Sequence, residues 1–142
     1  MHDHYENILV AVDESEQAQT AFIEAVAIAK RNQGKLTVAA VADTTNLWGD
    51  GYGVAEAMTA QKEAAQMVMD VLVNSFADGL TVEKIIEVGS PKSVIAKDLP
   101  EKYHYDLIVM GATGKGAIER VLLGSTTNFV VTHAPCNVMV VK

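Results

Sequence analysis

Five short apolar runs, separated by segments with helical periodicity, restrict the possible folds of this chain more than any other feature. We expect strands at Tyr5–Val12, Lys35–Val41, Leu80–Val88, Tyr105–Met110 and Asn137–Val141. A near-continuous apolar run such as Ile8–Val12 is typical of a strand buried on both faces of a parallel sheet. Strands that alternate with helices pair in parallel through right-handed crossovers. The sequence therefore predicts one α/β domain over residues 1–142, a doubly wound five-stranded parallel sheet with helices on both faces.

The segments between the strands predict four helices. We expect them at about Ser15–Asn32, Val54–Phe76, Pro91–Leu99 and Ser125–His133. Ser90 and Ser125 are expected at N-cap positions, where a side-chain oxygen accepts a bond from an unpaired backbone N–H. Pro100 is expected to help end the third helix, because proline lacks a backbone donor.

The long second helix and the loop before it carry several large apolar side chains. The apolar stripe of this helix is expected at Ala57, Ala64, Val68, Val71 and Leu72. Core packing is expected for its methionines Met58, Met67 and Met69. The glycine-rich segment Asp43–Gly53 predicts a loop, whose Trp48 and Tyr52 either cover the end of the sheet or form a lid or partner contact.

A glycine pattern follows the fourth strand, with the spacing Gly111-x2-Gly114-x9-Gly124-Ser125. It leads from a strand end to a helix start. Glycine lets the backbone approach a ligand closely, and a helix N-terminus offers unpaired N–H groups to an anion. The spacing matches neither a Walker loop nor G-x-G-x-x-G. The pattern favours a phosphate-binding site, and the alternative is that the glycines serve only tight turns.

Two segments that are distant in the sequence are expected to meet at this phosphate-binding site. Ligands of doubly wound sheets bind at the carboxyl ends of the strands, where the strand order reverses. In the order 3-2-1-4-5, Asp13 follows strand one and Gly111 follows strand four at that point. Asp13 is a candidate for a ribose hydroxyl, an adenine-side contact or a divalent cation, with capping of the next helix as the alternative. Lys115 either neutralises phosphate or lies in solvent, and Ser125 caps its helix, bonds phosphate, or does both.

The glycine pattern resembles the nucleotide-binding signature of the ATP-binding branch of the universal stress protein family. Gly111, Gly114, Gly124 and Ser125 match its positions, and the resemblance covers nearly the whole chain, including Ile8–Asp13, His133–Cys136 and Val138–Val141. The chain departs from the family pattern at Thr113, Thr126 and Asn137, where Arg or His, Val, and Pro are frequent.

The resemblance implies the same strand order, a stress-response role and an ATP pocket. Together with the residue chemistry it assigns the pocket to Ala11, Val12, Asp13, Val41, Met110, Gly111, Gly114, Lys115, Gly116, Gly124, Ser125, Thr126 and Thr127. Within this pocket, the resemblance implies that backbone groups near Val41 contact and recognise the adenine. Mg²⁺ or Mn²⁺ is expected to arrive with the phosphates, with Asp13 as the candidate protein ligand.

The leading functional interpretation is an ATP-binding regulatory protein switched by nucleotide occupancy. A slow ATPase or phosphotransferase is an alternative, although no general base or arginine finger stands out and no catalytic residue is assigned. A nucleotide-free dimeric interaction module is another, which the intact glycine set disfavours. A flavodoxin-like FMN carrier is disfavoured because no phosphate loop follows strand one.

Charge and composition limit the classes of binding partner and the cellular location that we expect. The net charge of −7 disfavours nucleic acid and anionic membrane surfaces, which require basic patches. No signal peptide and no apolar segment of membrane-spanning length is visible, and Cys136 is the only cysteine, so a cytoplasmic location is expected.

The final strand predicts a homodimer. In the order 3-2-1-4-5, residues 137–142 form an edge with no proline and no charge before Lys142. Bare edges invite pairing, and two copies related by a two-fold axis satisfy each other. The resemblance implies the same dimer, and the alternative is a monomer whose edge is covered by a loop.

Overall fold

The computed structural model describes residues 3–45, 51–114 and 122–142, with only the backbone described at 51 and 52. The strands are β1 (Asn7–Ala11), β2 (Lys35–Asp43), β3 (Val82–Gly89), β4 (Leu107–Gly111) and β5 (Asn137–Val141). The helices are α1 (Glu16–Asn32), α2 (Gly51–Phe76), α3 (Pro91–Ser93), the π-helical η1 (Val94–Asp98), α4 (Leu99–Tyr103) and α5 (Ser125–His133).

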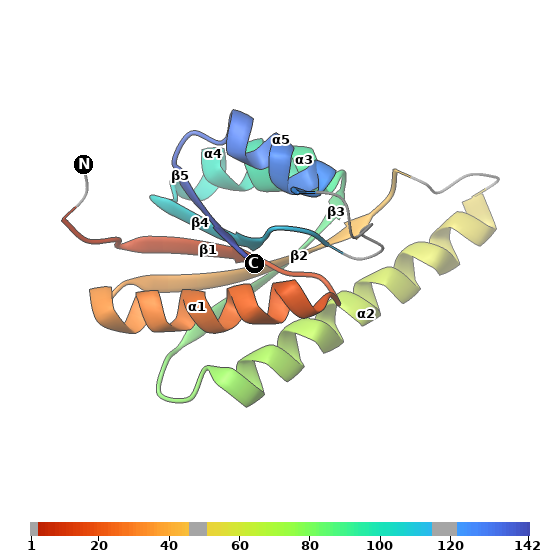
Figure 1. Ribbon diagram of the computed structural model, residues 1–142. Helices are drawn as coiled ribbons and strands as arrows, with labels where there is room; N and C mark the ends of the chain where they lie inside the picture. The colour runs from red at the N-terminus through yellow and green to blue at the C-terminus, as the bar shows by residue number, and fades with distance from the viewer. Residues whose placement is uncertain (1–2, 46–50, 115–121) are drawn as a thin grey trace.

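The strands form one sheet in the order β3-β2-β1-β4-β5, and all four neighbouring pairs are parallel. Val10 of β1 lies opposite Val38 of β2 on one side and Val109 of β4 on the other. Helices α1 and α2 cover one face of the sheet, and α3, α4 and α5 cover the other (Figure 1). The predicted α/β class, strand order and two-faced helical cover are confirmed.

The core consists of two apolar layers, one on each face of the sheet. Alternation along β1 sends Ile8 and Val10 into the layer beneath α1 and α2, and sends Leu9 into the layer beneath the other helices. Phe22 of α1 is fully buried in the first layer, and Leu99 is buried in the second. Burial on both faces explains why the central strands are apolar at nearly every position.

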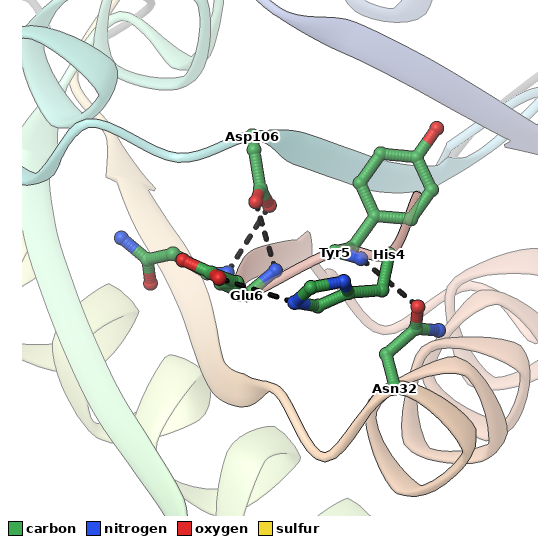
Figure 2. Close-up of polar contacts among 6 residues, drawn as sticks. His4, Tyr5, Glu6, Asn32 and Asp106 are labelled. Atoms are coloured by element: carbon green, nitrogen blue, oxygen red, sulfur yellow. Dashed lines mark hydrogen bonds and ion pairs between the residues drawn. The ribbon is translucent and has the colours of Figure 1, made fainter. Parts of the chain in front are cut away.

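A polar clasp holds the amino ends of the two central strands together (Figure 2). The Asp106 carboxylate accepts the backbone N–H of Glu6 at 2.8 Å and that of Asn7 at 3.1 Å. The Asn32 side chain accepts the N–H of Tyr5 at 2.9 Å, and His4 pairs with Glu6 at 3.1 Å. These groups lie at the end of the sheet opposite the carboxyl ends of the strands, so they belong to the scaffold.

Several details of the second helix differ from the prediction. It begins at Gly51, so residues 51–53 are helical, while Trp48 lies outside the described residues and so does the side chain of Tyr52. Leu72 and Met69 are buried as expected, but Val71 is 59% exposed and Met67 is 67% exposed. The physical reason is that the face packed on the sheet contains Ala65, Val68, Met69, Leu72 and Val73. It shares Val68 and Leu72 with the predicted stripe, while Val71 and Met67 lie beside it.

The prediction that Pro100 helps end its helix is wrong. The helical path continues to Tyr103, and the turn just before Pro100 is π-helical. The N–H of Leu99 bonds the carbonyl of Val94, five residues back. Proline lacks an N–H and clashes with the carbonyl four residues earlier, and the wider π turn removes that conflict.

Candidate functional site

An open cavity of about 1290 Å³ lies at the carboxyl ends of β1, β2 and β4, between α2 and the start of α5. It occupies the point where the strand order reverses, the usual ligand position of a doubly wound sheet. The predicted residues that line it are Ala11, Val12, Asp13, Val41, Met110, Gly111, Gly114, Gly124, Ser125, Thr126 and Thr127. Lys115 and Gly116 lie outside the described residues.

Two of the three motif glycines have neighbours too close for a side chain, and none of the three has a positive φ. A Cβ on Gly111 would lie 3.0 Å from the carbonyl carbon of Gln17, which is helix backbone. A Cβ on Gly114 would lie 2.7 Å from Oδ2 of Asp13, the end of a flexible side chain. The positive φ values among described glycines belong to Gly79 and Gly89, away from the motif. Gly111 therefore holds β4 against α1, whereas Gly114 lies against an acidic side chain of the cavity.

The loop after β4 is tied to its surroundings by three short backbone-donated bonds. The N–H of Thr113 donates to Oε1 of Gln17 at 2.8 Å, and the N–H of Ala112 donates to the carbonyl of Val141 at 2.8 Å. The N–H of Gly124 donates to the carbonyl of Ala112, also at 2.8 Å. These bonds fix the described ends of the loop, and with them the position of the α5 N-terminus.

The start of α5 opens on the cavity, and its N-cap residue Gly124 has no side chain that could cap the helix. The N-cap is Gly124, and Ser125 is the first helical residue, so the prediction of Ser125 as the N-cap is wrong. The helical bonds begin with the N–H of Asn128 to the carbonyl of Gly124 at 2.9 Å, so the N–H groups of the preceding turn have no helical partner. Because glycine at the N-cap offers no side-chain acceptor to these N–H groups, the first turn suits an anion.

Thr127 has a structural bond. Its side chain is 3% exposed, and its Oγ1 donates to the carbonyl of Gly111 at 2.8 Å. This bond ties α5 to the end of β4. A ligand contact from Thr127 would therefore come from its backbone.

Asp13 and Ser15 share the turn between β1 and α1. The hydroxyl of Ser15 accepts the N–H of Ala18 at 3.1 Å and caps α1, while Oδ1 of Asp13 accepts the N–H of Ser15 at 2.9 Å. The carboxylate of Asp13 is exposed and faces the cavity, with Oδ2 on the side of Gly114. The capping alternative thus applies to one oxygen of Asp13, and the same side chain reaches the cavity.

The described lining is acidic. Asp13, Glu14 and Asp43 contribute carboxylates, and no lysine or arginine is among the described residues of the wall. Within residues 3–45, 51–114 and 122–142, no cluster of three or more His, Cys, Asp or Glu side chains could hold a metal ion. Phosphate groups placed next to these carboxylates would be repelled by them, and a cation between the two would offset that repulsion.

Sequence reasoning missed one wall of the cavity. It is formed by α2, through Ala60, Gln61, Ala64, Ala65, Met67 and Val68. Pro91, Ile95 and Asp43 were missed as well. The apolar periodicity of α2 was visible, but it does not distinguish a face packed on a sheet from a face turned toward a cavity.

The fold and the cavity define a class: doubly wound α/β domains that have a ligand-sized cavity at the switch point and a helix N-terminus opening into it. The chain matches the universal stress protein family over residues 4–142. It belongs to that family.

Sequence relatives and solved structures match this chain over nearly all of its length. A universal stress protein relative from Staphylococcus aureus (strain USA300) is 40% identical over 144 residues, covering 97% of this chain and 84% of the relative. The structure of universal stress protein UspA from Lactobacillus plantarum superposes with a TM-score of 0.88 and 38% identity, covering 99% of this chain and 100% of that one. A universal stress protein solved in complex with cAMP gives a TM-score of 0.73 and 25% identity, with 99% of each chain covered. None of the described helices is both long and apolar enough to span a membrane.

Proposed function

We propose that this protein binds ATP in the switch-point cavity and acts as a stress-response regulator whose state depends on nucleotide occupancy. The observation that carries the proposal is the start of α5, with glycine at its N-cap, opening into the same cavity as Asp13 and Val41. A helix N-terminus is an anion seat, and the cavity is large enough for a nucleotide. The relative bound to cAMP supports an adenine nucleotide as the ligand class.

In this proposal the phosphates lie on backbone N–H groups near Gly114, Gly124 and Ser125. Asp13 contacts the ribose or a phosphate-bound cation, and backbone groups near Val41 contact the adenine. Mg²⁺ or Mn²⁺ enters with the phosphates, since these ions typically keep few protein ligands. The acidic wall fits that role, because a cation between Asp13 and the phosphates offsets their repulsion.

The first test is to release and identify the ligand carried by the purified protein, using mass spectrometry. The second is calorimetry with ATP on Gly114→Val and Gly124→Val, which place bulk where the backbone meets the cavity. Gly53→Val is the matched control, because a Cβ there meets nothing within 4 Å. We expect both motif variants to lose affinity and the control to keep it. Unchanged affinity in both motif variants overturns the proposal.

A homodimer through β5 is part of the proposed regulatory unit, and a cytoplasmic location is part of the same proposal. The two sheet edges differ in chemistry: β3 carries Glu83, Lys84 and Glu87, whereas β5 carries no charge. Charges protect an edge from pairing, so β5 is the edge suited to a second copy.

Light scattering at micromolar concentration tests the dimer. Met139 of β5 and Val88 of β3 are each 37% exposed, which makes them a matched pair of edge positions. We expect Met139→Lys to lower the mass toward a monomer and Val88→Lys to leave it unchanged. A monomeric mass for the unmodified protein refutes the dimer.

A further inference from the structure

Helix α2 carries an apolar stripe that does not face the sheet. Met67 is 67% exposed and Val71 is 59% exposed, whereas Met69 and Leu72 on the sheet side are buried. The members of the stripe follow one another at alternating steps of three and four residues, which places them on one face of the helix. We call this stripe the α2 seam, and it consists of Ala57, Ala60, Ala64, Met67 and Val71. Ala57 is half-buried, and the other members are exposed.

The seam lies away from the sheet edge that is proposed for the dimer. Helix α2 packs on β2 and β3, whereas β5 is at the opposite edge of the sheet. The first turns of α2 project beyond the end of α1 (Figure 1). From Ala57 to Val71 the seam is about 21 Å long, or about four helical turns. Exposed apolar side chains gathered in a row indicate an interaction site, whereas scattered single ones do not.

A row of carboxylates follows one side of the seam. Glu56, Glu63 and Asp70 recur at every seventh residue, and each directly precedes a seam residue. Lys84 of β3 pairs with Asp70 at 2.7 Å. Glu56 and Glu63 are exposed, and neither forms an ion pair within the part of the chain that the structure describes. This side of the seam is therefore negative, at the flanking positions that select partners in paired helices.

An open hollow of about 330 Å³ extends along the acidic side of α2. Its lining residues are Ala55, Glu56, Thr59, Ala60 and Glu63. Three of these side chains are small, and the two acids lie two helical turns apart. A lysine or arginine side chain suits this hollow, because its apolar stem can pack on small residues while its charged head reaches a carboxylate. The hollow thus favours a partner that brings a basic residue to this side of the seam.

A second copy of α2 is a poor match for the seam. In an antiparallel pair the acidic row of one copy faces the acidic row of the other, and the like charges repel. In a parallel pair the acidic row faces the other flank of the seam, which carries Gln61 and Val68 and offers no cation. Charge complementarity therefore favours a basic helix over self-pairing.

We propose that the α2 seam docks an amphipathic helix of another protein, one that carries lysine or arginine beside its apolar face. The alanines of the seam let a second helix approach closely, and Met67 and Val71 supply the larger apolar contacts. Cations of the partner pair with Glu56 and Glu63, which gives the complex its charge specificity. Part of the seam also lines the switch-point cavity, so a docked helix lies beside that cavity. The docking face is proposed independently of ATP binding.

The experiment measures the fluorescence anisotropy of labelled helical peptides that are titrated with the whole protein. Two peptides of about 20 residues, each held helical by a hydrocarbon staple, share leucine at their apolar positions. One carries lysine beside the leucines and the other carries glutamate. The seam variants are Val71→Gln and Glu63→Lys. Their matched controls are Val131→Gln, at a valine of α5 that is 45% exposed, and Glu24→Lys, at an exposed acid of α1. Thermal unfolding checks that each variant is folded.

We expect the lysine peptide to bind and the glutamate peptide not to bind. Val71→Gln should weaken binding of the lysine peptide about 5-fold or more, because the burial of an exposed valine is lost. Glu63→Lys should weaken it about 3-fold or more in low salt, because an attractive charge becomes a repulsive one. Both control variants should stay within about twofold of the unmodified protein.

Three outcomes would overturn the proposal. The first is equal binding of the two peptides, or equal losses in the seam variants and their controls. The second is a lysine peptide that shows no saturable binding up to about 1 mM. The third is a mass above that of a dimer in light scattering, lowered by Val71→Gln but not by Val131→Gln, because a second copy then occupies the seam.

Discussion

Replacing two glycines of the same motif by alanine should separate a folding role from a binding role. In Gly111→Ala, the new Cβ would lie 3.0 Å from two atoms of Gln17 and 3.1 Å from a third, two of the three being helix backbone. Because α1 cannot rotate away from this contact, the strand or the helix must shift. Overpacking of this kind costs about 1–3 kcal/mol. Alanine loses less conformational entropy than glycine when a strand forms, and this offsets about 0.5–1 kcal/mol of the cost.

The net expectation for Gly111→Ala is a loss of about 1–2 kcal/mol in the free energy of unfolding. For a chain of this size, that corresponds to a fall of roughly 2–8 °C in Tm. In Gly114→Ala the Cβ meets Oδ2 of Asp13 at 2.7 Å, but this exposed carboxylate can turn aside. Turning the carboxylate weakens the bond from Ser15 to Asp13, and the alanine offsets part of that loss, so we expect a smaller change than in Gly111→Ala.

Urea and thermal unfolding measure the two stabilities, and ATP titration measures the binding. We expect Gly111→Ala to lose stability and Gly114→Ala to lose affinity at nearly unchanged stability. Gly53→Ala is the control for a glycine whose Cβ meets nothing. Equal stability losses at positions 111 and 114, or none at 111, would refute the packing argument.

Three further outcomes are expected. Thr127→Val removes the buried bond to Gly111 and should lower the free energy of unfolding by about 1–2 kcal/mol. Thr132→Val removes an exposed bond of the same helix and should change that free energy by about 0.5 kcal/mol or less. Equal losses in the two variants would contradict this expectation. Burial raises the pKa of Cys136 from 9.0 to about 11 and that of Tyr105 from 10.0 to about 12. The folded state favours the neutral thiol of Cys136 and the neutral phenol of Tyr105. Their contribution to the free energy of unfolding is therefore complete below about pH 9 and is lost as the pH rises toward 12. Urea titrations should show that loss, and Cys136→Ala with Tyr105→Phe should flatten it; an unchanged alkaline slope would contradict the assignment. ATP turnover should stay below about 1 per second, the lower range of ordinary kinases, and a faster rate in a phosphate-release assay would reveal an enzyme.

The sequence by itself determined the sheet and the class of site. Continuous apolar runs at strand length, separated by helical periodicity, leave parallel pairing as the consistent arrangement, and the strand order followed from the same alternation together with the family resemblance. Gly111 and Asp13 could be assigned to one crevice because they follow the two strands that flank the switch point. Local chemistry also gave the start of α1 near Ser15.

The tertiary structure decided which partner each motif residue has. Periodicity gives the apolar face of α2 but not its phase relative to the sheet, so Met67 and Val71 turned out exposed while Met69 is buried. The spacing of the glycines does not reveal that Gly111 meets helix backbone and Gly114 meets a carboxylate, because those neighbours come from a distant segment. Pro100 predicts a helix end from local sterics, and only the packed helix, with its π turn, shows how the chain passes through it. The α2 wall of the cavity likewise exists only once residues 60–68 lie across the cavity from α5.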